Sequence, residues 1–204
     1  MPSFIMKLIL ARHGETVGNV MMINQGQMHG ELTSQGRMQA ILLGKRLSAE
    51  SIGAIYVSDL RRCVQTAEHV IVHHPDVPVY YEPLLRERHL GFLEGTKWGE
   101  VIRHTNLSGE EILNYRPEGG ESINDVKYRV SQFLTNISQR HDNQTVLVVS
   151  HGQYIANIVL HVMGLDDTHY DEHKPENTAV SIIALTNPPN LFMSNCTAHL
   201  ENNK

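Results

Sequence analysis

The sequence predicts an α/β fold with a mostly parallel sheet that is covered by helices on both faces. Four short and nearly continuous apolar runs have the composition of buried strands, at residues 5–11, 54–57, 146–149 and 180–185. Between these runs, apolar residues recur at the three- and four-residue spacing of amphipathic helices. Strands that alternate with helices along a chain form parallel sheets with helices on both sides.

The helices are expected from their caps and from their apolar spacing. Thr33 is a plausible N-cap for a helix that ends at Leu47, with Met38 and Ile41 among its inward-facing residues. Residues 17–32 before it form a polar loop in this interpretation. Three more helices are expected over residues 58–71, 122–137 and 152–162, and two more strands over residues 77–81 and 191–200.

The middle of the chain departs from this alternation. Residues 84–121 are rich in charge and glycine, and their apolar periodicity is weak. We expect short helices near 97–104 and 109–115, within a lid-like excursion that lies over a site. Ser122 and Asp125 then resemble a capping box, which marks the return to a long core helix.

Length, charge and cysteine content limit the class of protein. The 204 residues suit one domain spanning 1–204, and a hydrophobic fraction of 41% is enough for a full core. A net charge of −5 argues against nucleic acid or an anionic membrane as the partner. Cys63 and Cys196 make no disulfide framework, and the first residues lack the basic start of a signal peptide. We therefore expect a cytoplasmic protein, either a monomer or a homodimer.

Side chains that suit phosphate chemistry follow the predicted strands. Arg12 and His13 come directly after the first apolar run, and His151 follows the run at 146–149. Arg62 lies in the first turn of the helix after the second strand, and Glu87 follows the third strand. Because the carboxyl ends of parallel strands meet at one edge of a sheet, we expect these five side chains to share a pocket.

Two histidines, two arginines and one glutamate suit phosphoryl transfer through a histidine. A neutral imidazole nitrogen of His13 can attack phosphorus, and the nearby arginines favour that neutral form. Arg12, Arg62 and His151 can donate hydrogen bonds to the phosphoryl oxygens. Glu87 can protonate the departing alkoxide and then deprotonate the attacking water. Because side chains supply the positive charge, we expect neither a metal ion nor a cofactor.

Five motifs follow one another in a fixed order along the chain. They are Arg12-His13-Gly14-Glu15-Thr16 with Asn19, Ser58-x-Leu60-x-Arg62, Leu85-x-Glu87-x-x-x-Gly91, Gly119-Gly120-Glu121-Ser122 and Val148-Val149-Ser150-His151-Gly152. Together they resemble the histidine phosphatase superfamily, the phosphoglycerate-mutase-like proteins, across residues 8–186. The resemblance implies a three-layer αβα sandwich with a mixed, mostly parallel sheet.

The resemblance also implies a role for individual residues. His13 would be the phosphorylated nucleophile and Glu87 the proton donor, with Glu15 as a hydrogen-bond partner rather than the acid. The Ser-x-Leu-x-Arg spacing selects Arg62 for the site and leaves Arg61 on the surface. The expected catalytic set is His13, Glu87, Arg12, Arg62 and His151. The expected substrate-binding set is Arg12, Asn19, Gln25, Gly26, Arg62, Glu87, Arg88, His151 and Gly152.

Several residues leave alternatives open. Glu94 and Glu121 are rivals to Glu87 as the proton donor. Trp98 is either an anchor of the lid over the substrate or a core residue. His169 and His173 lie among acidic residues, where a zinc site is the alternative to a solvated loop.

A phosphohistidine can pass its phosphate to water or to a second alcohol, and the sequence favours water. Phosphoglycerate mutases place Tyr where this chain has Leu90 and Lys where it has Trp98, and they carry a longer basic insertion than the one near Arg116. The run at 115–122 looks like phosphatases that act on fructose 2,6-bisphosphate, on α-ribazole phosphate, or broadly. We therefore expect a phosphomonoesterase for a small phosphorylated metabolite. The alternatives are a 2,3-bisphosphoglycerate-dependent phosphoglycerate mutase and a non-catalytic phosphate-binding protein.

Overall fold

The structure is a computed structural model that describes residues 6–99, 107 and 110–203. In these residues a six-stranded sheet has the order β3-β2-β4-β1-β5-β6. The strands are β1 (Met6–Arg12), β2 (Ala54–Val57), β3 (Val79–Tyr81), β4 (Gln144–Ser150), β5 (Val180–Ala184) and β6 (Asn190–Cys196). Every predicted strand is therefore present.

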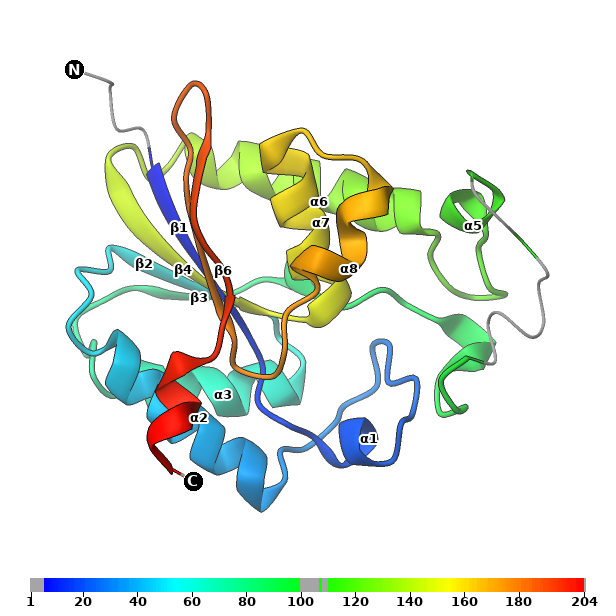
Figure 1. Cartoon of the computed structure of the whole chain (residues 1–204), viewed down its shortest axis with the longest axis horizontal. Coiled ribbons are helices and arrows are strands. Elements are labelled where there is room, and N and C mark those ends of the chain that lie inside the picture. The colour runs from blue at the N-terminus through cyan, green and yellow to red at the C-terminus, as the bar shows by residue number, and fades with distance from the viewer. Residues whose placement is uncertain (1–5, 100–106, 108–109, 204) are drawn as a thin grey trace.

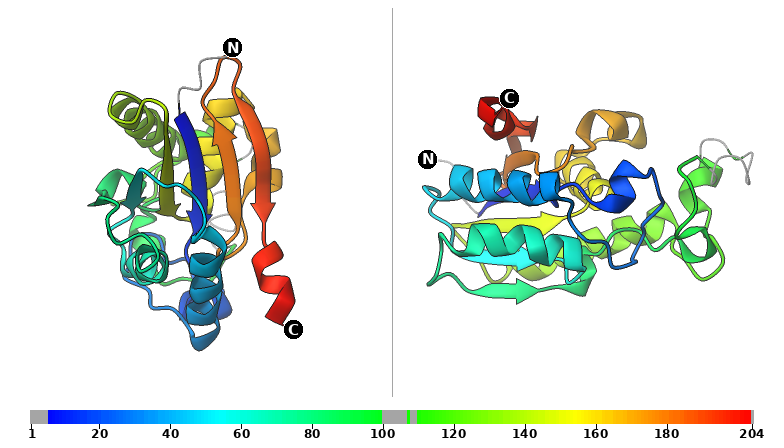
Figure 2. Two further views of the ribbon diagram at one scale, coloured as in Figure 1. Left: turned by 90° about the vertical axis from the view of Figure 1, so that its left-hand side faces the viewer. Right: turned by 90° about the horizontal axis from the view of Figure 1, so that it is seen from below.

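The sheet is mixed and mostly parallel. Strand β1 pairs in parallel with β4, so that Arg12 lies opposite Ser150, and β2 pairs in parallel with both β4 and β3. Strand β5 runs antiparallel to β1, and β6 antiparallel to β5. Figure 2 shows β1 between β4 and β5 near the middle of the sheet. Residues Leu8 to Ala11 are buried because helices cover both faces, which explains the apolar run.

Helices form the two outer layers of the sandwich. In Figure 1 the sheet lies between α6 and α7 above and α2 and α3 below. The α-helices are α1 (Val17–Val20), α2 (Ser34–Leu47), α3 (Arg61–Ile71), α5 (Glu110–Asn114), α6 (Ile123–Ser138), α7 (Gly152–Met163) and α8 (Tyr170–His173). The described residues also form the 3₁₀ helices η1 (Pro83–Leu85), η2 (Gly91–Leu93), η3 (Asp167–His169) and η4 (Ala198–Asn203). Phe133 of α6 belongs to one core cluster, and Leu43 of α2 to the other.

The expected caps are present. The Thr33 side chain accepts a hydrogen bond from the Gly36 amide at the start of α2. Ser122 and Asp125 form a reciprocal capping box at the start of α6. Each cap satisfies backbone donors that a helix leaves free in its first turn.

The inward face of α2 differs from the prediction. Met38 and Ile41 are exposed, and the buried residues include Ala40, Leu43 and Gly44. A Cβ atom on Gly44 would collide with the His69 carbonyl of α3. The two helices approach closely at Gly44, a residue without a side chain. A prediction that looks for large apolar residues does not detect such a contact.

Three other segments refine the prediction. Residues 17–32 contain the short helix α1 and are not loop throughout. The helix expected near 97–104 is wrong at its start, because Lys97 forms a β-bridge with Ile23, and residues 100–104 lie outside the described residues. In the described part of the chain, no helix has the length and apolar character needed to cross a membrane.

Candidate active site

A cavity of about 390 Å³ opens at the carboxyl ends of β1 and β4. The expected residues that line it are Arg12, Asn19, Gln25, Gly26, Arg62, Glu87, Arg88 and Gly152. His13 and His151 are buried beside Arg12 and Arg62, with their ring centroids 5.3 Å apart. The structure therefore places Arg12, Arg62 and Glu87 in the wall of one cavity and the two histidines directly behind the arginines.

The ring of His13 is held in one tautomer. Its Nδ1 lies 2.8 Å from the Gly14 carbonyl oxygen, which can only accept, so Nδ1 carries the proton. In the neutral ring, Nε2 then has a free lone pair. The turn itself is fixed, because the Gly14 amide donates to Thr66 and the His13 carbonyl accepts from Asn177.

Electrostatics keep this ring neutral. Burial lowers the pKa of His13 well below its ordinary value, and the charges of Arg62 and Arg12 lower it further. A neutral imidazole with a free Nε2 lone pair is the form in which histidine acts as a nucleophile.

Arg62 ties the second histidine to the loop at the mouth of the cavity. Its Nε donates to His151 Nδ1 at 3.2 Å, so the neutral ring of His151 carries its proton on Nε2 and donates it to Ser58 Oγ. The two terminal nitrogens of Arg62 donate to the carbonyls of Gly26 and Met28, each at 2.7 Å. Burial, followed by the charge of Arg62, lowers the pKa of His151 well below its ordinary value.

Arg12 contributes a donor that has no partner. Its Nη1 donates to the Pro175 carbonyl at 2.7 Å, whereas its buried Nε has no hydrogen-bond partner among the described residues. Gly152, the first residue of α7, lies against the guanidinium group, because a Cβ there would be 3.6 Å from it. A buried unpaired donor next to a helix N-terminus favours an anion at this position.

The loop after β1 presents amide groups to the cavity. Asn19 Oδ1 accepts hydrogen bonds from the backbone and the side chain of Thr16, at 3.1 Å and 2.9 Å. This capping contact occupies the oxygen and leaves the Asn19 NH₂ group for another acceptor. Gln25 is placed in a similar way, with its Oε1 3.0 Å from Thr16 Oγ1.

Glu87 is the one carboxylate among the described residues that line the cavity. Its Oε1 accepts from the Arg88 amide at 2.9 Å, and its Oε2 accepts from the Gln153 amide at 3.1 Å. These two backbone donors fix the carboxylate between residues 84–121, called the lid segment from here on, and the first turn of α7. The position faces the same cavity as Arg12 and suits a group that exchanges protons with a bound ester.

The rival carboxylates are engaged elsewhere. Glu94 Oε1 accepts from the amides of Gln27 and Leu90, and thereby joins the loop after β1 to the lid segment. Glu121 accepts from both the Nε and Nη2 atoms of Arg129. Glu15 accepts from Thr33 Oγ1 at 2.7 Å, which supports its expected part as a hydrogen-bond partner.

Three further expectations concern residues at the rim. Arg88 lines the cavity, but its Nε and Nη2 donate to the carbonyls of Glu121 and Tyr115, so it also anchors the lid segment. Arg61 is exposed and pairs with a surface carboxylate, as expected. Trp98 is half-exposed and lines the cavity with its Nε1 bonded to the Ile23 carbonyl, which supports the lid anchor rather than the core residue.

Sequence reasoning missed one wall of the cavity. Tyr170 and Lys174 line it, although residues 166–173 read as a solvated loop. The segment instead forms η3 and α8, and His173 is buried with its Nδ1 3.1 Å from Ser194 Oγ. The described residues contain no group of three or more side chains placed to hold a metal ion. No periodic pattern in the sequence marks this wall, because α8 has only four residues.

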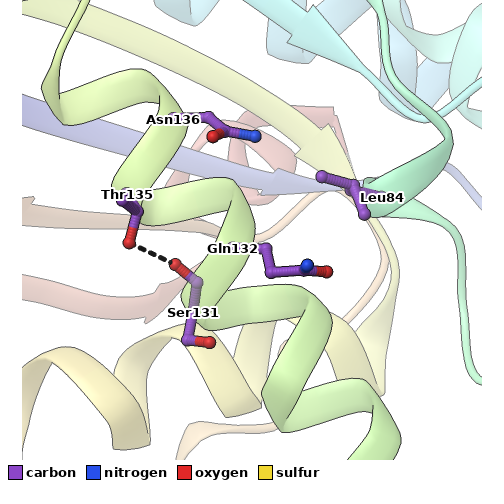
Figure 3. Close-up of a pocket in the computed structure, with 5 residues that line it drawn as sticks. All are labelled: Leu84, Ser131, Gln132, Thr135 and Asn136. Atoms are coloured by element: carbon purple, nitrogen blue, oxygen red, sulfur yellow. Dashed lines mark hydrogen bonds between the residues drawn. The ribbon is translucent and has the colours of Figure 1, made fainter.

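A second hollow lies on the surface of α6. Figure 3 shows that Ser131, Gln132, Thr135 and Asn136 line it together with Leu84 of η1. None of these side chains is ionisable near neutral pH, and no histidine or cysteine is among them. This hollow therefore offers no ionisable group for catalysis near neutral pH.

Comparison with known proteins identifies the family. Residues 8–192 match the histidine phosphatase superfamily (branch 1). Phosphoserine phosphatase 1 of Hydrogenobacter thermophilus is 32% identical over 96% of this chain and 95% of its own. The solved structure of Bacillus stearothermophilus YhfR has a TM-score of 0.85 at 32% identity, covering 96% of this chain and 100% of that one. A phosphoserine phosphatase of Entamoeba histolytica, solved in complex with phosphoserine, has a TM-score of 0.83 at 27% identity with the same coverage. The chain belongs to the histidine phosphatase superfamily.

Proposed function

We propose that this protein is a phosphomonoesterase that acts through a phosphohistidine on His13. The observation that carries the proposal is the free Nε2 lone pair of a buried neutral His13, next to Arg12 and Arg62, which line a cavity with one carboxylate among its described residues. The relative named phosphoserine phosphatase, which matches nearly the whole chain, supports a phosphatase that takes a small phosphorylated metabolite.

The reaction has two displacements at phosphorus. His13 Nε2 attacks the ester, the bond from phosphorus to the ester oxygen breaks, and Glu87 gives its proton to the departing alkoxide. Arg12, Arg62 and the first turn of α7 stabilise the charge on the phosphoryl oxygens. Water then attacks phosphorus, Glu87 takes its proton, and the P–N bond breaks to release inorganic phosphate and neutral His13.

Water is favoured over a second alcohol as the acceptor. Leu90 and Trp98 line the cavity where mutases are expected to carry Tyr and Lys. At these two positions, the described part of the lid segment therefore carries neither the hydroxyl nor the ammonium that the mutase pattern places there. Release of inorganic phosphate without interconversion of 2- and 3-phosphoglycerate separates the phosphatase from the mutase.

Two features of the wider molecule fit this activity. Residues 84–121 are proposed to act as a lid, because the described part of this segment contacts the loop after β1 through Ile23 and Lys97.

The free thiols of Cys63 and Cys196 support a reducing, cytoplasmic location. Burial raises the pKa of the Cys63 thiol to about 12, so this thiol is not a competing nucleophile.

Trapping of the phosphoenzyme tests the proposal. Protein mixed with a phosphate ester and quenched should carry acid-labile, base-stable phosphate, and His13→Ala should carry none and release no phosphate. His161→Ala, on the exposed side of α7, is the matched control and should keep both properties. Activity should also persist in EDTA, because arginines supply the positive charge. Phosphate on another residue, or full turnover by His13→Ala, would refute the mechanism.

A further inference from the structure

The wall of the cavity formed by α8 has a chemistry that phosphoryl transfer does not use. Tyr170 and Lys174 both line the cavity. The Lys174 amide donates to the Tyr170 carbonyl at 3.0 Å, so the two residues are one helical turn apart and share a face. This face presents a hydroxyl group and an ammonium group to the cavity, where a bound substrate would lie next to them.

Neither of these polar groups contacts a hydrogen-bond or ion-pair partner among the described residues. In the described part of the chain, the Lys174 ammonium has no ion-pair or hydrogen-bond partner, and the Tyr170 hydroxyl has no hydrogen-bond partner. Burial raises the pKa of Tyr170, and the nearby Glu87 carboxylate raises it further, so the phenol remains a hydrogen-bond donor at neutral pH. Both groups are therefore available to a ligand.

The three arginines among the described residues that line the cavity bond to the protein or lie at the phosphoryl site. Arg62 bonds to His151 and to two carbonyls of the loop after β1, and Arg88 bonds to two carbonyls of the lid segment. Arg12 lies with its unpaired Nε at the phosphoryl site. Among the described lining residues, Lys174 is the one positive charge besides these arginines, and Glu87 is the one negative charge. The cavity is thus more positive than a single phosphoryl group requires.

We propose that Tyr170 and Lys174 form a subsite for a second anionic group, a carboxylate or a second phosphate, on the leaving-group part of the substrate. The proposal rests on the phosphatase function and assigns its substrate class. The phosphoryl group lies against Arg12, and the leaving group extends toward α8. A cavity of about 390 Å³ limits that leaving group to a small molecule.

Matched pairs of esters test the subsite. The carboxylate arm compares O-phosphoserine with O-phosphoethanolamine and 3-phosphoglycerate with glycerol 3-phosphate. The phosphate arm compares fructose 1,6-bisphosphate with fructose 6-phosphate. The wild-type protein should prefer the member with the second anion in one arm. Lys174→Met should remove that preference by lowering kcat/KM about 10-fold or more through KM, the size of a lost charged hydrogen bond.

Control substrates and variants separate this proposal from the phosphatase function. In Lys174→Met, kcat/KM for p-nitrophenyl phosphate, which has no second anion, should fall less than kcat/KM for the preferred ester. Lys174→Arg should restore most of the preference, Tyr170→Phe should weaken it, and Lys45→Met on the exposed face of α2 should change nothing. Equal effects of Lys174→Met on both members of every pair, or no wild-type preference in either arm, would overturn the subsite. Absence of p-nitrophenyl phosphate hydrolysis by the wild-type protein would instead overturn the phosphatase function.

Discussion

At the scale of single residues, the proton on His13 Nδ1 determines which nitrogen can react. The Gly14 carbonyl accepts a hydrogen bond from Nδ1. Burial lowers the pKa of the ring, so Nε2 stays unprotonated. The carboxylate that must exchange protons with substrate and water is supplied from another segment, at Glu87. Nucleophile and acid can therefore be removed separately, and their two roles can be distinguished by kinetics.

Replacing Glu87 by Gln should uncouple the two displacements. Esters with poor leaving groups should react about 10²–10⁴-fold more slowly, because the alkoxide leaves without a proton. p-Nitrophenolate needs no proton, so the first displacement should persist, and rapid-quench kinetics should show a burst followed by accumulation of phosphoenzyme. Glu31→Gln, an exposed carboxylate that pairs with Arg61, is the control. If both kinds of ester slow equally and no phosphoenzyme accumulates, the proton donor is another group.

Sequence reasoning located the residues that follow buried strands and missed those on α8. Arg12, His13 and His151 were predictable because an apolar run ends directly before each group, and the run fixes where the strand ends. Tyr170 and Lys174 were not predictable in this way, because a helix of four residues leaves no periodic pattern. The partners of Arg62 were hidden for another reason: backbone carbonyls bind it, and carbonyls carry no sequence signal.

At the scale of elements, two segments of backbone cross directly beneath the site. A Cβ atom on Gly14 would lie 2.5 Å from the Gly36 carbonyl oxygen, and one on Gly36 would collide with the Glu15 carbonyl. The turn that carries His13 therefore rests on the first turn of α2 without any intervening side chain. Both contacts are with backbone, which cannot move aside as a flexible side chain can.

Gly14→Ala should therefore destabilise the protein. Forcing a methyl group into this contact should lower the free energy of unfolding by about 1–3 kcal/mol, as overpacking does elsewhere. Urea denaturation gives the measurement. Gly152→Ala is the comparison, since its Cβ would meet its nearest neighbour at an ordinary 3.6 Å and a helical alanine is favoured over glycine. Equal stability of Gly14→Ala and wild type would show that the two backbones separate easily.

Most elements could be predicted from the sequence, and the exceptions have physical causes. Strands β1, β2, β4 and β5 are mostly apolar because helices cover both faces of the sheet. The short helix α1 was missed because none of its residues is buried and its cap, Thr16 with Asn19, resembles a polar loop. The interior of α2 was misjudged because Gly44, which has no side chain, lies against the backbone of α3.

At the scale of the whole molecule, two buried neutral histidines link stability to pH. The folded-state pKa values of His13 and His151 lie well below the value of about 6.5 that histidine has in an unfolded chain. Below that value the unfolded chain binds protons that the native state does not bind. The stability contributed by the neutral rings is therefore complete above about pH 6.5 and is lost as the pH falls toward the folded-state pKa values.

The free energy of unfolding should accordingly fall on acidification, and His13→Gln should weaken that dependence. Each such histidine adds up to about 1.4 kcal/mol per pH unit to the slope below pH 6.5. Urea titrations between pH 8 and pH 5 give the slopes of the wild-type protein and the variant. Exposed His161, replaced by Gln, should leave the slope unchanged. A His13→Gln slope equal to that of the wild type would mean that His13 titrates alike in both states.

The floor and the walls of the cavity come from different parts of the chain, so substrate specificity can change separately from the catalytic residues. The floor comes from β1, α3 and the start of α7, whose side chains are buried and bonded to one another. The walls come from a loop, a 3₁₀ segment and α8, where Ile23, Leu90, Trp98 and Lys174 are partly or fully exposed. Substitutions in the walls leave the core packing intact, so new substrates can be acquired by a few surface changes while the chemical step is inherited unaltered. We therefore expect a small library of variants at those four positions to yield phosphatases with altered substrate specificity.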